Sequence, residues 1–139
     1  MENEFKKIVL CTIMTIGMAS VSVMAGGKST GKDFILNKTA IRGYEQIDSL
    51  GKGYASTTVK ATTNDYKDAK PTVGANLYNT SGEIVDYDYK QGVSSGINAV
   101  VYTRYLADPL SKDVAGISSK HSTHYHIDES VSLPYLGRP

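Results

Sequence analysis

The three histidines of the chain lie within six residues, in the run HSTHYH, and their spacing suits a metal site. They are His121, His124 and His126. Alternate side chains of a strand point to the same face, so His124 and His126 would share one face with Asp128. Such a face suits Zn²⁺ or Cu²⁺, with His121 or Asp128 as a third ligand. The alternative is a polar outer face on an edge strand, which discourages pairing with other sheets.

Tyrosine supplies most of the aromatic surface, because the chain has ten tyrosines, two phenylalanines and no tryptophan. Tyr87, Tyr89 and Tyr102 fall on predicted strands, and an exposed tyrosine surface there would stack on sugars or form a protein interface. The alternative is that these rings form the core, since tyrosine suits half-buried strand faces. The apolar parity on which most tyrosines fall favours the core, and these three remain the candidate binding surface.

Three other patterns have enzymatic counterparts. Asp86 and Asp88 could act in glycoside hydrolysis or bind Ca²⁺, but neither has a partner visible in the sequence that would shift its pKa. Residues 26–33 (GGKSTGKD) resemble a phosphate-binding loop, but Asp33 stands where a hydroxyl is needed and no buried strand precedes it. No Gly-x-Ser-x-Gly motif accompanies the many serines. We therefore predict a protein that is not an enzyme and has no cofactor.

Residues 1–25 have the pattern of a secretory signal peptide, which we expect to be helical. Lys6 and Lys7 precede an apolar stretch at residues 8–18, and Val23-Met24-Ala25 fits the cleavage pattern. The alternative is an uncleaved anchor, because residues 8–25 reach the lower limit for spanning a membrane. The only cysteine lies inside this leader, so the predicted mature domain has no disulfide.

The remaining residues predict one small domain built of strands. Residues 26–38 are rich in glycine, serine and lysine and read as a flexible lead-in, and residues 39–139 form a single β domain. About six short strands separated by turn clusters indicate an all-β fold, most simply a small antiparallel β-sandwich. The expected strands are residues 39–47, 54–63, 72–78, 83–89, 97–106 and 121–131, followed by a tail at 133–139.

Three of these strands carry specific expectations. Residues 72–78 and 83–89 predict a hairpin whose turn uses Gly82. In its second strand, Val85, Tyr87 and Tyr89 are expected on one face, with Asp86 and Asp88 on the wet face. Residues 97–106 are apolar on both parities and predict a central strand covered on both sides.

Charge and composition narrow the function classes. The net charge is +1 at pH 7 and basic residues are scattered, so neither nucleic acid nor an anionic membrane is a favoured partner. Contact with the membrane is expected only during export. The leading hypothesis is a small secreted, extracellular, non-catalytic binding protein whose partner is a cell-surface glycan or a protein. The alternatives are a secreted antibacterial, toxin-like protein and a metal-binding protein that uses the histidine cluster.

Overall fold

The structure is a computed structural model that describes residues 20–24, 26–108, 110 and 113–139. Within these residues the chain forms nine strands and one short 3₁₀ helix, η1 (Asn64–Tyr66). No helix in the described ranges is long and apolar enough to cross a membrane. The strands are β1 (Ser20–Met24), β2 (Gly27–Leu36), β3 (Thr39–Asp48), β4 (Gly53–Thr62), β5 (Pro71–Asn79), β6 (Ile84–Gln91), β7 (Val100–Tyr102), β8 (Val114–Thr123) and β9 (Val131–Gly137).

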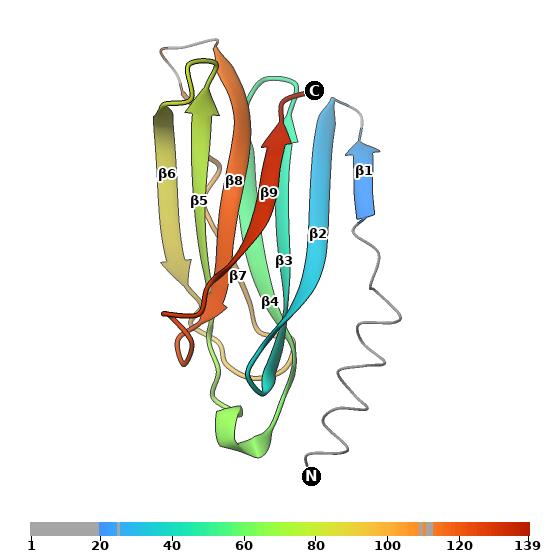
Figure 1. Cartoon of the computed structure of the whole chain (residues 1–139), viewed down its shortest axis with the longest axis vertical. Coiled ribbons are helices and arrows are strands. Elements are labelled where there is room, and N and C mark those ends of the chain that lie inside the picture. The colour runs from blue at the N-terminus through green and yellow to red at the C-terminus, as the bar shows by residue number, and fades with distance from the viewer. Residues whose placement is uncertain (1–19, 25, 109, 111–112) are drawn as a thin grey trace.

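The strands form two antiparallel sheets, so the prediction of an all-β fold with antiparallel sheets is confirmed. One sheet has the order β1-β2-β3-β4-β7 and the other the order β6-β5-β8-β9. Figure 1 shows β6, β5, β8 and β9 side by side in one layer. The number of strands exceeds the six expected, mainly because β2 and β9 lie in segments predicted as a lead-in and a tail.

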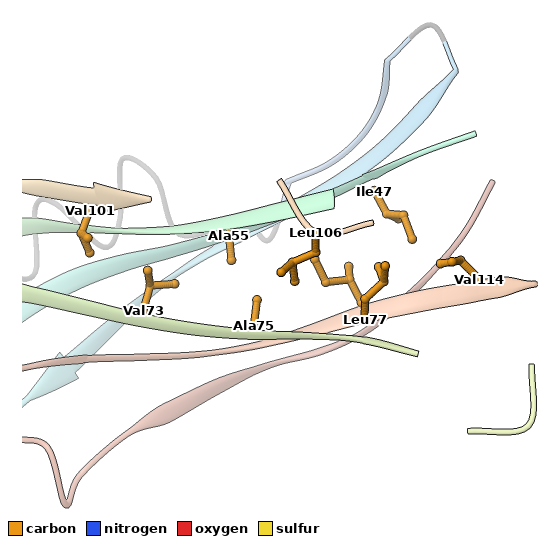
Figure 2. Packing of buried hydrophobic residues seen from close by; sticks show 9 residues of the cluster. Ile47, Ala55, Val73, Ala75, Leu77, Val101, Leu106 and Val114 are labelled. Carbon is orange, nitrogen blue, oxygen red and sulfur yellow. The ribbon is translucent and has the colours of Figure 1, made fainter. Parts of the chain in front are cut away.

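The core lies between the two sheets and follows from the alternation of side chains along the strands. On β5, for example, Val73, Ala75 and Leu77 are buried while the residues between them face the other way. Figure 2 shows these side chains meeting those of the facing sheet. The buried apolar cluster consists of Ile47, Ala55, Val73, Ala75, Leu77, Val101, Leu106, Val114 and Ile117.

The predicted hairpin is present as β5 and β6. Gly82 has a φ of +82°, a conformation that glycine adopts without steric cost. The side-chain Oδ1 of Asn79 accepts hydrogen bonds from the backbone N–H groups of Ser81 and Glu83 and so closes the turn. The sequence therefore specifies this turn locally.

The face assignment on β6 was wrong. The register changes between Leu77 and Tyr78, so that Leu77 lies opposite Asp86 but Tyr78 lies opposite Ile84. Val85 is the extra residue of this bulge and packs against the core. Tyr87 and Tyr89 therefore face outward, and Asp86 and Asp88 have the inward parity.

Residues 27–36 form β2, which contradicts the predicted flexible lead-in. This strand pairs with β3 along its full length, from Gly27 opposite Asp48 to Leu36 opposite Thr39. The small polar residues here are tolerated because backbone hydrogen bonds to β3 hold the strand. Of the predicted leader, residues 1–19 and 25 lie outside the described residues, and Ser20–Met24 form β1 at the edge beside β2.

The central strand predicted at residues 97–106 was also wrong. Only Val100–Tyr102 form a strand, β7, at the edge of the five-stranded sheet. Gly96 and Asn98 have positive φ values of 84° and 70°, which interrupt an extended chain before β7 begins. Leu106 returns to the core through a single bridge to Gly53, which explains its apolar character without a continuous strand.

The last predicted strand, residues 121–131, was wrong as well. β8 ends at Thr123, and residues 124–130 turn back so that β9 can pair antiparallel with β8. The segment 133–139, predicted as a tail, contributes most of β9.

Candidate functional site

A groove of about 530 Å³ lies over the outer face of the β6-β5-β8-β9 sheet. Its floor is formed by the residues of β5 and β8 whose side chains alternate with those of the core. One side is bounded by tyrosines of β6, and the other by the loop after β8 and by β9. The outward side chains that form it include Thr72, Asn76, Tyr78, Tyr87, Tyr89, Ser118, Lys120, Ser122, Ile127, Ser130 and Ser132.

Pairing across the sheet arranges the groove residues in rows. Tyr89 lies opposite Gly74, Gly74 lies opposite Lys120, and Lys120 lies opposite Ser132. This row therefore crosses all four strands and contains one position, Gly74, without a side chain.

The neighbouring row has an ordered polar floor. Tyr87 lies opposite Asn76, and Asn76 lies opposite Ser118. The Nδ2 group of Asn76 donates to the hydroxyl of Tyr78 at 3.4 Å, and that hydroxyl is hydrogen-bonded to Oγ of Ser118 at 2.9 Å. The ring of Tyr78 also packs edge-on against Tyr135, with centroids 6.0 Å apart. These contacts fix polar groups in place before any ligand arrives.

The candidate binding tyrosines divide between the two sheets. Tyr87 and Tyr89 are 70% and 58% exposed and lie together at the groove. Tyr102 is on β7 of the other sheet, where its neighbour Val101 faces the core and Tyr102 faces out. Its ring lies 6.2 Å from that of Tyr54. The structure thus brings together two of the three residues.

The tyrosines around Tyr102 mostly contact one another. The ring of Tyr54 lies 5.9 Å from that of Tyr44 and 5.1 Å from that of Tyr105. Burial and the neighbouring tyrosines raise the pKa of Tyr54 to about 12. The rings of this cluster contact one another, with Tyr102 and Tyr105 56% and 61% exposed, whereas the rings of Tyr87 and Tyr89 make no aromatic contact with other described residues.

The three histidines lie in three different environments, and the prediction that His124 and His126 share the outer face of a strand was wrong. His121 is on β8 and is fully buried between the sheets. His124 follows the strand, and its Nδ1 accepts a hydrogen bond from the backbone N–H of Lys70 at 2.7 Å. His126 is buried against Tyr66, with ring centroids 5.3 Å apart. Because β8 ends at Thr123, strand alternation does not apply to the last two.

The predicted ligands His121, His124 and His126 do not come together as a metal centre in the structure. The part of the chain that the structure describes holds no group of three or more His, Cys, Asp or Glu placed to bind a metal ion. Among the described residues, one imidazole lies near a carboxylate: Nδ1 of His126 is 3.8 Å from Oε2 of Glu129.

A buried polar network between the sheets is the feature that sequence reasoning missed. Oγ of Ser119 donates to Oε2 of Glu45 at 2.6 Å and lies 2.8 Å from Nε2 of His121. Nδ1 of His121 lies 2.7 Å from Oγ1 of Thr57. One proton arrangement satisfies all three contacts: Thr57 donates to Nδ1, Nε2–H donates to Ser119, and Ser119 donates to Glu45.

Burial sets the charge state of this network. It raises the pKa of Glu45 to about 7, although the hydrogen bond from Ser119 opposes the change. It lowers the pKa of His121 to about 4. The imidazole is therefore neutral near pH 7. Gly43 makes room for it, since a Cβ there would lie 2.6 Å from Cδ2 of His121.

The network contains serine, histidine and glutamate but does not have the order of a nucleophilic triad. In a triad the histidine stands between the serine and the carboxylate, and the serine faces the substrate. Here Ser119 stands between His121 and Glu45, and all three are buried. The network therefore joins β3, β4 and β8 across the two sheets.

The paired carboxylates have a partner that the sequence did not reveal. Asp86 forms an ion pair with Arg104, with Oδ1 and Nη2 2.6 Å apart. Asp88 accepts a hydrogen bond from the backbone N–H of Arg104 at 2.8 Å. Hydrogen bonding to Arg104 holds the pKa of Asp86 below its usual value. The two residues thus tie β6 to the segment after β7.

Comparisons with known proteins add no template for this site. No family model, no curated protein and no solved structure matches the chain.

Proposed function

We propose that the protein is an extracellular, non-catalytic binding protein that holds a carbohydrate chain in the groove of the β6-β5-β8-β9 sheet. The observation that carries this proposal is the combination of exposed tyrosine rings with an ordered polar floor in one groove. The export of the protein is proposed from the leader pattern at residues 1–25.

The surface chemistry of the groove matches that of a sugar. A sugar ring has an apolar C–H face and a rim of hydroxyls. The rings of Tyr87 and Tyr89 offer flat apolar surface, and the Asn76–Tyr78–Ser118 chain offers donors and acceptors. The volume of about 530 Å³ lies in the range of small-ligand pockets, about 300–1,000 Å³. An oligosaccharide segment would fit this size.

The position of the groove favours a glycan over an extended peptide. Peptides that add to sheets pair with the backbone of an exposed edge strand. The floor of this groove is made by β5 and β8, whose backbones already pair with strands on both sides. A ligand here must be recognised by side chains, as sugars commonly are.

Glycan binding can be tested on an array of neutral and acidic oligosaccharides with the purified protein. The groove variant Tyr87→Ala/Tyr89→Ala is compared with a matched control, Tyr102→Ala/Tyr105→Ala, which removes the same atoms from β7 and the segment after it. We expect the groove variant to lose binding by at least about tenfold and the control to keep it. Absence of any bound glycan, or equal loss in both variants, would overturn the proposal.

Export can be tested by recovering the protein from the culture medium of its natural host and measuring its intact mass. We expect a mature chain that starts at Gly26. A chain that retains Met1 would contradict cleavage of the leader.

A further inference from the structure

One row of the groove, which crosses the sheet through Gly74, has an aromatic ring on one side of this glycine and a cation on the other. Tyr89 and Lys120 are the partners of Gly74 on its two sides. Strands in a sheet lie about 4.8 Å apart, so Tyr89 and Lys120 are separated by about 10 Å between their Cα atoms. Gly74 contributes no side chain to this interval. The row therefore leaves a space of about one ring between the two side chains.

Lys120 is exposed and has no ion pair in the described part of the chain. Its neighbours on the groove face of β8 are Ser118 and Ser122, and across the strand lies Ser132. Among the described residues that line the groove, Asp88 is the one acidic residue, but its side chain has the inward parity and accepts the backbone N–H of Arg104. The hydroxyl of Ser122 already donates to the backbone carbonyl of His126, and that of Ser118 is hydrogen-bonded to Tyr78. The ammonium group of Lys120 is therefore the feature that attracts an anion, with Ser132 as the neighbouring hydroxyl.

We propose that the ligand of the groove is an acidic glycan, in which a sugar ring stacks on Tyr89 above Gly74 and its anionic group binds Lys120. This inference rests on the proposed carbohydrate-binding function. The anionic group is a carboxylate or a phosphate ester attached next to the ring. Both chemistries place negative charge a few ångströms from an apolar ring face, which matches the ring-to-cation interval of the row.

A substitution at Gly74 can test the space between Tyr89 and Lys120 without disturbing the fold. A Cβ at this position would lie 3.5 Å from Cδ2 of Tyr89, an ordinary van der Waals distance, and the glycine does not need a positive φ. A Gly74→Val substitution should therefore fold while filling the space between the ring and the cation.

The charge requirement can be measured by calorimetry with two pairs of matched ligands. The first pair is hexagalacturonate and its methyl ester, and the second is 6-phosphorylated maltohexaose and maltohexaose. We expect the charged member of at least one pair to bind about tenfold more tightly than the neutral one, and the pair in which this occurs identifies the anion. Salt should weaken only the charged ligand.

Two lysine variants connect this difference to Lys120. Lys120→Gln should remove the tenfold preference, and Lys120→Arg should keep most of it. Lys90→Gln is the matched control, because Lys90 is exposed on β6 of the same sheet but has the opposite parity and does not border the groove. It should leave the preference unchanged. Gly74→Val should weaken the charged and neutral ligands together.

The outcomes separate this inference from the proposed function. Equal binding of charged and neutral ligands, or equal losses in Lys120→Gln and Lys90→Gln, would overturn the acidic-glycan inference and leave glycan binding standing. Absence of binding by all four ligands together with an empty glycan array would overturn both.

Discussion

The two faces of β8 carry similar polar residues in opposite circumstances. On the core side, Ser119 and His121 are buried and hydrogen-bonded to one another, with Glu45 as the next partner. On the groove side, Lys120 alternates with them and is exposed without an ion pair among the described residues. The buried groups hydrogen-bond to one another, although Oε1 of Glu45 has no partner among the described residues. A polar group left unpaired at an exposed groove is instead available to a ligand.

This difference shows that residue type alone does not locate a binding site. Ser119, His121 and Glu45 are of the types most often found in catalytic sites, yet all three are buried between the sheets. The groove is formed instead by tyrosine, serine and lysine, which are ordinary surface residues of a sheet. Substitutions on the core face of β8 should therefore change stability, and those on the groove face should change binding.

The largest effect is expected from Gly43→Ala. The new Cβ would lie within 3 Å of three atoms of the His121 ring, which is itself fully buried. We expect the free energy of unfolding in urea to fall by about 3 kcal/mol. Gly74→Ala is the control, since the same methyl group meets only ordinary contacts there. Equal stability of the two variants would refute the tight packing of His121.

A smaller loss is expected from Ser119→Ala. This change leaves Oε2 of Glu45 and Nε2 of His121 without the hydroxyl that joins them. A buried polar group deprived of its partner costs stability, and we expect a loss of about 2 kcal/mol in the same urea experiment. Ser132→Ala, on the exposed groove side, should change stability by less than about 0.5 kcal/mol. Equal losses of stability in Ser119→Ala and Ser132→Ala would contradict the distinction between the two faces of the sheet.

The pH dependence of stability should reveal two opposed titrations inside the network. The pKa of Glu45 is raised from 4.5 to about 7, so its contribution is complete below pH 4.5 and is lost as the pH rises toward 7. The pKa of His121 is lowered from 6.5 to about 4, so its contribution is complete above pH 6.5 and is lost as the pH falls toward 4. Between pH 4.5 and 6.5 the two slopes partly cancel.

Glu45→Gln should remove one of these slopes. Relative to the wild type, the variant should lose stability more steeply as the pH falls from 6.5 to 4.5, by about 1 kcal/mol per pH unit. His121→Gln should show the opposite change, with stability falling as the pH rises over the same interval. Urea titrations at half-unit pH steps provide the measurement, and profiles parallel to that of the wild type would exclude the opposed titrations.

The smallest effect in stability is expected on the groove face. Tyr89→Ala removes a ring that is 58% exposed, so the free energy of unfolding should change by less than about 0.5 kcal/mol. Glycan affinity should nevertheless fall by about 1 kcal/mol, because the ring provides the stacking surface. A loss of stability larger than the loss of affinity would place Tyr89 with the structural residues and would weaken the distinction between the two faces.

Local signals in the sequence predicted the parts of the fold that local contacts determine. The β5–β6 hairpin depends on Asn79 and Gly82, which act within the turn itself, and it was found where expected. The bulge at Val85 was not predictable, because it depends on how β6 meets its neighbour and leaves no local signature. That single residue decides that Tyr87 and Tyr89 face the groove.

The sequence identified only those groove residues that can be named from their residue type. Tyr87 and Tyr89 could be named from their residue type, but Lys120 and Gly74 acquire meaning only from strand pairing across the sheet. The buried network was invisible because Glu45 and Ser119 are 74 residues apart. The histidine run led to a wrong strand prediction, because β8 ends at Thr123. The chain turns there so that β9 can pair with β8, and this pairing is not visible in the local sequence.

The members of the buried network are far apart along the chain, and this separation affects the folding rate. His121 contacts Thr57, which lies 64 residues earlier in the chain, so this contact joins distant segments. Contacts between distant segments make folding slow, and β-sandwiches commonly take milliseconds to seconds. Because the network joins β3, β4 and β8, we expect refolding of the domain to be slow and the network to form late.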